Sequence, residues 1–158
     1  MISYTSNGTP SEDDEEHTLV DFCDLKGWKH THFSNETYTT SWKQKNKMKY
    51  LGVHSGVPDH LVIVRRKDGT TVPAYVEMKR EKGGTISDTQ FEWIEALLQA
   101  GQFVAACEGG EEAVKFVTAV ENNDTKTIDE FIEKFEKKRE KRLKNLEKKE
   151  KYEKDNPF

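Results

Sequence analysis

Residues 56–90 read GVPDHLVIVRRKDGTTVPAYVEMKREKGGTISDTQ and predict two strands joined by a turn, followed by a helix. The apolar run 61–64 forms the first strand, and a turn over 67–69 leads into the second strand, 72–79. Pro73 has no N–H to give to a sheet ladder, so it belongs at the start of that strand or on an edge. Alternate strand residues share a face. One face of the second strand is therefore apolar and directed towards a core (Val72, Ala74, Val76 and Met78), and the other carries Tyr75, Glu77 and Lys79.

Charged side chains gather at one end of this predicted hairpin. Pro58 fixes its own backbone angle and presents Asp59 at the entrance of the first strand, opposite the strand that carries Glu77 and Lys79. Two carboxylates and a lysine at one sheet edge outline a site that binds a divalent metal and activates water. Two simpler explanations stay open. Pro58-Asp59 is also an ordinary turn dipeptide, and Glu77 with Lys79 can be an exposed ion pair worth at most ~1 kcal/mol.

The same residues carry a family resemblance. Pro58-Asp59 followed by Glu77-Met78-Lys79 resembles the PD-(D/E)xK nuclease motif. The longer pattern is similar to the VRR-NUC branch of that superfamily, and it adds residues 56–59, the glycine pair 83–84, Ile86, Ser87 with Gln90, and Trp93. The resemblance covers roughly residues 16–117. It implies an α/β, restriction-endonuclease-like core of one helix, a mixed sheet of about four strands and a packed helix.

The resemblance also implies roles for individual residues. Mg²⁺, for which Mn²⁺ can substitute, would be held by Asp59, Glu77 and the backbone carbonyl of Met78. Lys79 would orient or deprotonate the attacking water, and Gln90 would lie beside that water or the phosphate.

An N-terminal helix would supply one more carboxylate near the metal. Glu16 is the expected residue and Glu15 the alternative. Either glutamate is explained equally well as an ordinary acid in the first turn of the helix, where it complements the helix dipole.

Uneven charge favours DNA as the partner, although an ordinary surface with patchy charge has the same appearance. Residues 26–82 hold twelve Lys/Arg and five Asp/Glu, whereas the whole chain has a net charge of −4. Residues 37–51 read as a loop in which lysines alternate with Tyr38, Trp42 and Tyr50, a mixture that can stack bases and neutralise phosphates or simply form a lysine-rich surface loop. The expected DNA-binding residues are Lys43, Lys45, Lys47, Lys49, His54, Ser55, Arg80 and Lys82. His54 and His60 lack the spacing of a zinc array, so each is expected to be a phosphate contact or a loop residue.

The other elements follow from periodicity and capping signals. A helix is expected over 12–26, with Leu19, Phe22, Cys23 and Leu25 on its apolar stripe and Gly27 as its end. A strand is expected over 28–33, broken at 34–36. Ser87 with Gln90 forms a capping box for a helix over 87–100. A strand over 102–107, a helix over 111–120 and a tail helix opened by a capping box at Thr127 complete the chain. The expected divisions are a disordered N-terminus over 1–11, the nuclease-like domain over 12–120 and a charged helical extension over 121–158.

Composition and the resemblance together bound the function. The chain lacks a run of eighteen apolar residues and a signal-peptide pattern, so no membrane association is expected and the location is cytoplasmic, in a bacterial or phage-infected cell. Cys23 and Cys107 are expected to be buried thiols. The resemblance implies a Mg²⁺-dependent DNA endonuclease, homodimeric and specific for branched DNA such as four-way (Holliday) junctions. The alternative is a catalytically silent nucleic-acid-binding or scaffold module with the same fold.

Overall fold

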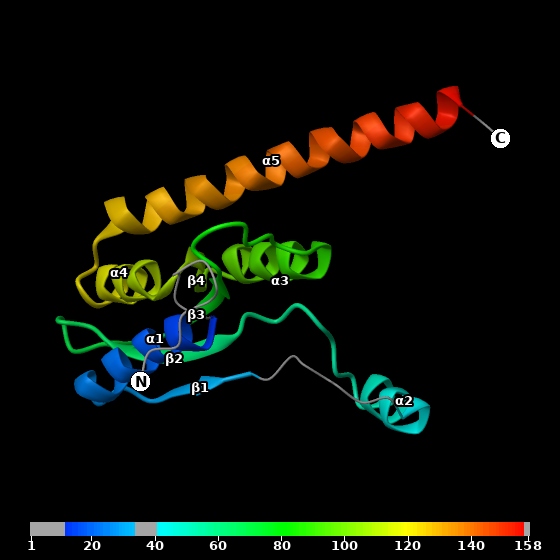
Figure 1. Ribbon diagram of the computed structural model, residues 1–158. Helices are drawn as coiled ribbons and strands as arrows, with labels where there is room; N and C mark the ends of the chain where they lie inside the picture. Colours follow the sequence, from blue (N-terminus) through cyan, green and yellow to red (C-terminus); the bar gives the residue numbers. More distant parts are fainter. Residues whose placement is uncertain (1–11, 34–40, 157–158) are drawn as a thin grey trace.

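A four-stranded mixed sheet forms the centre of the protein (Figure 1). The computed structural model describes residues 12–33 and 41–156; the expected disordered segment 1–11, the expected strand break at 34–36 and Tyr38 lie outside them. The strands are β1 (His30–His32), β2 (His60–Arg65), β3 (Thr71–Lys79) and β4 (Phe103–Glu108), in that spatial order. The β1–β2 and β2–β3 pairs are antiparallel and the β3–β4 pair is parallel. The expected α/β fold with a mixed sheet of four strands is confirmed.

The described residues form five helices, and all except α2 pack against the sheet or against one another. They are α1 (Glu12–Lys26), α2 (Trp42–Tyr50), α3 (Asp88–Gln99), α4 (Gly110–Glu121) and α5 (Thr125–Asp155). α1 and α4 contribute to the larger apolar cluster, whereas α3 packs in a second cluster with Val104 and Tyr75. Because alternate residues of β3 and β4 enter different clusters, the two clusters lie on opposite faces of the sheet.

Strand β3 carries the predicted alternation. Ala74, Val76 and Met78 are buried in the larger cluster, and Tyr75 packs against the smaller one. Glu77 points away from the larger cluster, as expected. It is only 1% exposed, so its carboxylate is buried and does not lie at the surface of the sheet edge. The far face of β3 therefore changes from Tyr75, which packs in an apolar cluster, to the charged pair Glu77 and Lys79 at the end of the strand.

The start of α3 follows the sequence signal closely. The Ser87 hydroxyl accepts from the backbone N–H of Gln90, and the Gln90 side chain accepts from the backbone N–H of Ser87. Ile86 packs against the cluster that contains Phe91. These contacts fix where the helix begins, and so they fix where Gln90 lies relative to the end of β3.

Residues 42–50 are a helix and not the expected loop. Lys, Gln and Met are good helix formers, and the segment contains no Gly or Pro. The helix has no buried residue, and Trp42 is 76% exposed and Tyr50 89% exposed, so neither aromatic anchors it. In Figure 1, α2 stands apart from the sheet, beyond the end of β1.

Three further expectations need correction. Leu25 is 88% exposed, whereas Leu19 and Cys23 of its stripe are buried in the core and Phe22 packs against it. β1 is shorter than expected, and Trp28 ahead of it is buried in the core instead of being in the strand. The tail helix begins two residues before Thr127 with Asp124 as its N-cap, and the backbone N–H of Thr127 donates to Asp124 at 3.1 Å. Asp124, one turn earlier, therefore caps this helix in place of the expected capping box at Thr127.

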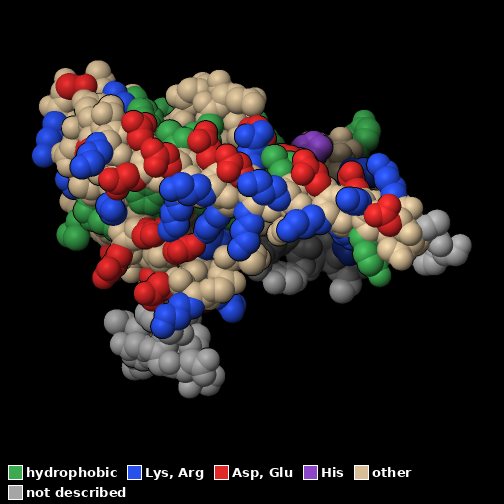
Figure 2. All heavy atoms as spheres, turned by 90° about the horizontal axis from the view of Figure 1, so that it is seen from above, with side chains coloured by type: hydrophobic (Ala, Val, Ile, Leu, Met, Phe, Trp, Pro, Cys, Tyr) green, Lys and Arg blue, Asp and Glu red, His purple; other side chains and the backbone are tan. Residues whose placement is uncertain are grey.

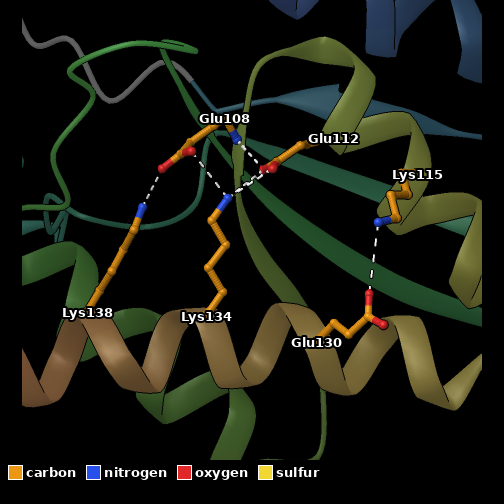
Figure 3. Close-up of polar contacts among 6 residues, drawn as sticks. All are labelled: Glu108, Glu112, Lys115, Glu130, Lys134 and Lys138. Carbon is orange, nitrogen blue, oxygen red and sulfur yellow. Dashed lines mark hydrogen bonds and ion pairs between the residues drawn. The ribbon is translucent and has the colours of Figure 1, made fainter.

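The first half of α5 is attached along the body of the protein. Phe131 enters the larger cluster and Phe135 the smaller one, where its ring centroid is 5.4 Å from that of Phe91. Between them, Lys134 reaches the carboxylates of Glu108 and Glu112 (Figure 3). Seen from above, lysine and arginine side chains lie beside acidic ones along this helix (Figure 2). Among the described residues, none of the helices combines the length and the apolar character that a bilayer crossing requires.

Candidate functional site

The loop before β2 brings Asp59 against the end of β3. Pro58 is buried, and the strand register places His60 opposite Val76. The Asp59 carboxylate then accepts a hydrogen bond from the backbone N–H of Met78 at 2.9 Å. Asp59 is thus held at the residue that separates Glu77 from Lys79.

Glu77, Lys79 and Gln90 contact one another at this point. Lys79 Nζ lies 2.8 Å from Glu77 Oε1 and donates to Gln90 Oε1 at 3.0 Å. The Gln90 amide nitrogen donates to the same Glu77 oxygen. The Lys79 side chain is only 13% exposed, so this group of three lies largely out of water.

Gln90 contacts both the start of its own helix and the charged residues at the end of β3. Its Oε1 accepts from the Ser87 backbone at 2.9 Å as part of the capping box, and from Lys79 as described. Its Nε2 reaches Glu77. Because one amide serves the helix start and the ionic group together, α3 holds the end of β3 in a fixed position.

The Glu77 carboxylate is buried with fewer partners than a charge needs. Burial, reinforced by the negative charge of Asp59, raises the pKa of Glu77 to about 7, and the contacts with Lys79 and with the backbone of Asp59 oppose the rise only in part. Within residues 12–33 and 41–156, no hydrogen-bond donor reaches Glu77 Oε2. A buried oxygen left without a partner is costly. An acidic pair with one unmatched oxygen fits a hard divalent cation such as Mg²⁺, which prefers oxygen ligands.

Two glycines allow the backbone segments to meet here. Gly56 has φ +94°, and a Cβ on it would lie 2.6 Å from the backbone carbon of Thr89. A Cβ on Gly84 would lie 2.9 Å from Cβ of Lys79. The Asp59 loop and the turn after β3 therefore both pack more closely than any side chain permits.

The two candidate glutamates of α1 have different surroundings. Glu15 accepts a hydrogen bond from the backbone N–H of Gly110 at 2.5 Å, which gives it a structural contact with the start of α4. Glu16 instead has its Oε2 3.9 Å from Nε2 of His32 and 4.0 Å from Nε2 of His60. The geometry thus separates the two, and only Glu16 faces β1 and β2.

His60 is neither a loop residue nor at the surface, contrary to expectation. It is the first residue of β2, it is 1% exposed, and its ring stacks on that of His32 with centroids 4.8 Å apart. Burial, with the charges of His32 and His30, lowers its pKa to about 4, so the ring is neutral at pH 7. Spacing rules did not find this group because its members are 16, 32 and 60 in the chain and meet only through strand pairing.

The expected DNA-binding residues fall into three places. Four are the exposed lysines of α2, where the helical period puts Lys43 and Lys47 on one side and Lys45 and Lys49 on the other. His54 and Ser55 line a hollow of about 360 Å³ over the outer side of α3, beside Trp93. Arg80 and Lys82 are exposed directly after Lys79. The last two groups adjoin the segments that carry Asp59 and Lys79.

Two comparisons with known proteins return the same domain. A family model described as the VRR-NUC domain matches residues 11–111. One similar solved structure is that of a "VRR_NUC domain protein"; it aligns with a TM-score of 0.53 and 19% identity, over 68% of this chain and 84% of that one. At this identity the likeness shows a shared fold. No curated protein matches the sequence.

Proposed function

The chain belongs to the VRR-NUC domain family of nuclease domains, and from this membership we propose that it is a Mg²⁺-dependent DNA endonuclease. The observation that carries the proposal is the buried Glu77 carboxylate, which lies beside Asp59 and Lys79 with one oxygen unmatched among the described residues. A purely structural ion pair would satisfy both oxygens or leave them in water.

In this proposal Asp59, Glu77 and the backbone carbonyl of Met78 hold the cation, and Mn²⁺ can replace Mg²⁺. A bound divalent ion lowers the pKa of a water molecule and draws charge from the scissile phosphate. The hydrogen bond from Met78 N–H to Asp59 keeps the first carboxylate at a fixed distance from β3. Fixed ligands of this kind avoid a reorganisation cost when substrate arrives.

Lys79 and Gln90 act on the water and the phosphate. An ammonium has three donors, and the contacts of Lys79 with Glu77 and Gln90 occupy two of them. The third can orient the attacking water or neutralise charge that develops on the phosphate. Gln90 holds the side chains of Glu77 and Lys79 in fixed positions through its two contacts.

The proposed substrate is DNA, with branched DNA such as four-way junctions as its preferred form. The exposed lysines of α2, together with Arg80, Lys82, His54 and Ser55, would contact phosphates. A homodimer would relate two sites by a two-fold axis and let them cut two symmetric strands. The branched substrate and the dimer rest on the family resemblance.

A cleavage assay with matched lysine variants tests the proposal. Supercoiled, linear and four-way-junction DNA are incubated with Mg²⁺, with Mn²⁺ and with EDTA. We expect cutting only with a divalent ion and fastest on the junction. Lys79→Ala should lower the rate at least ~100-fold with DNA affinity largely retained. Lys115→Ala is the control, because that lysine is 59% exposed, lies in the middle of α4 and pairs with Glu130 of α5.

Two results would contradict the proposal. One is equal cutting by Lys79→Ala and the wild type, and the other is equal cutting with EDTA and with Mg²⁺. Binding of junction DNA without any cleavage, under all metal conditions, would instead identify the chain as a catalytically silent DNA-binding module.

A further inference from the structure

Three side chains from separate elements meet on the α1 face of the sheet. His32 and His60 face each other across the β1–β2 pair, with their rings stacked at an interplanar angle of 22°. Glu16 of α1 approaches both, at 3.9 Å and 4.0 Å from their Nε2 atoms. The three potential ligand atoms all lie within 4.8 Å of one another.

One of these ligand atoms is buried and unsatisfied. The His60 side chain is 2% exposed, and across the part of the chain that the structure describes no hydrogen-bond partner reaches its Nε2. A buried polar atom without a partner costs free energy. Nε2 faces the group formed with Glu16 and His32, so a ligand bound there would remove the cost.

We propose that Glu16, His32 and His60 bind one divalent transition-metal ion of the Zn²⁺ type, which ties α1 to β1 and β2. Imidazole and carboxylate together suit Zn²⁺, Co²⁺ or Mn²⁺, whereas Mg²⁺ prefers oxygen alone. Metal–ligand bonds of about 2.0–2.2 Å place ligand atoms roughly 3–4 Å apart. The Glu16–histidine distances already reach the upper part of that range. His32 is 46% exposed, so its ring can adjust.

This site is separate from the proposed nuclease site. His60 lies on the strand face of Val62 and Val64, which pack in the cluster that includes Leu19 of α1. Asp59, one residue earlier, directs its carboxylate to the backbone of Met78. The ion would therefore share no ligand with Asp59 and Glu77, and its effect would be to hold the first residue of β2 in place.

Co²⁺ absorption spectroscopy on the full chain without a histidine tag tests the site. In excess Mg²⁺, we expect one Co²⁺ per chain with visible absorption that Zn²⁺ displaces, and a higher melting temperature with either ion. His32→Gln should weaken Co²⁺ binding at least tenfold and remove the thermal shift. The matched control is His30→Gln, two residues away on the same strand, because that ring contacts Asp24 at 2.9 Å.

A second control separates this proposal from the nuclease proposal. Asp59→Asn should keep Co²⁺ binding in excess Mg²⁺, whatever it does to DNA cleavage. Absence of Co²⁺ binding by the wild type, equal binding by folded His32→Gln, or loss of binding in Asp59→Asn would each overturn the site. None of these readouts depends on nuclease activity, so either proposal can fail alone.

Discussion

Two lysine–glutamate groups lie at the ends of adjacent strands and differ in how well their charges are matched. One contains Glu77 and Lys79 at the end of β3; the other contains Glu108 at the end of β4, with Glu112 and the α5 lysines Lys134 and Lys138. The strand register places Lys79 opposite Glu108, so the groups are neighbours in the sheet. Composition alone does not distinguish them.

Burial and hydrogen bonding do distinguish them. Each carboxylate oxygen of Glu108 and Glu112 has a lysine partner, as Figure 3 shows, and hydrogen bonds from Lys138 and Lys134 lower the pKa of Glu108 despite partial burial. Glu77 is more deeply buried, has an unmatched oxygen among the described residues and has a raised pKa. The β4 group therefore attaches α5, and the β3 group has the unmatched charge that a functional site needs.

Cleavage should show the largest difference between the two groups. Glu77→Gln keeps the size of the side chain but removes the charge proposed to hold the cation, so we expect the cleavage rate to fall about 10³-fold. Glu108→Gln should change it less than about threefold. Single-turnover cleavage of junction DNA in Mg²⁺ measures both, and similar losses in the two variants would show that the β3 group has no special role.

In EDTA, Glu77→Gln and Glu108→Gln should change the free energy of unfolding in opposite directions. The pKa of Glu77 is raised in the folded state from 4.5 to about 7, so its favourable contribution is present below about pH 4.5 and is lost as pH rises through 7. Glu77→Gln should then exceed the wild type in free energy of unfolding by roughly 2–3 kcal/mol at pH 8 and by little at pH 5. Urea titrations at both pH values measure this.

The same titrations contain their control. Glu108 has a lowered folded pKa, so Glu108→Gln should lose stability at pH 8 where Glu77→Gln gains it. A Glu77→Gln protein less stable than the wild type at pH 8 would mean that the carboxylate is adequately paired without a cation.

The smallest expected effect concerns the α5 lysines. Lys134 is 35% exposed, so solvent screens its contacts with Glu108 and Glu112. Lys134→Ala should cost about 1 kcal/mol in low salt and less in 1 M salt. Urea unfolding in both salts measures the change; a larger loss that salt does not alter would mean that packing of the lysine stem, and not charge, attaches the helix.

The sequence by itself determined the local features. The alternation in β3, the Ser87–Gln90 capping box and the Gly27 helix end were predicted correctly, because each depends on residues a few positions apart. The family pattern likewise identified Asp59, Glu77, Lys79 and Gln90, and the structure brings these four together.

Only the tertiary structure decided which charged groups each of those residues faces and how deeply each is buried. The depth of Glu77, the contact of Glu15 with Gly110 and the meeting of Glu16 with His32 and His60 all join positions far apart in the chain. Helix α2 and the Asp124 cap show that even local signals compete, since several are compatible with the same stretch. Periodicity specifies which side chains share a face, but the free energy of a buried charge depends on what long-range packing places beside it.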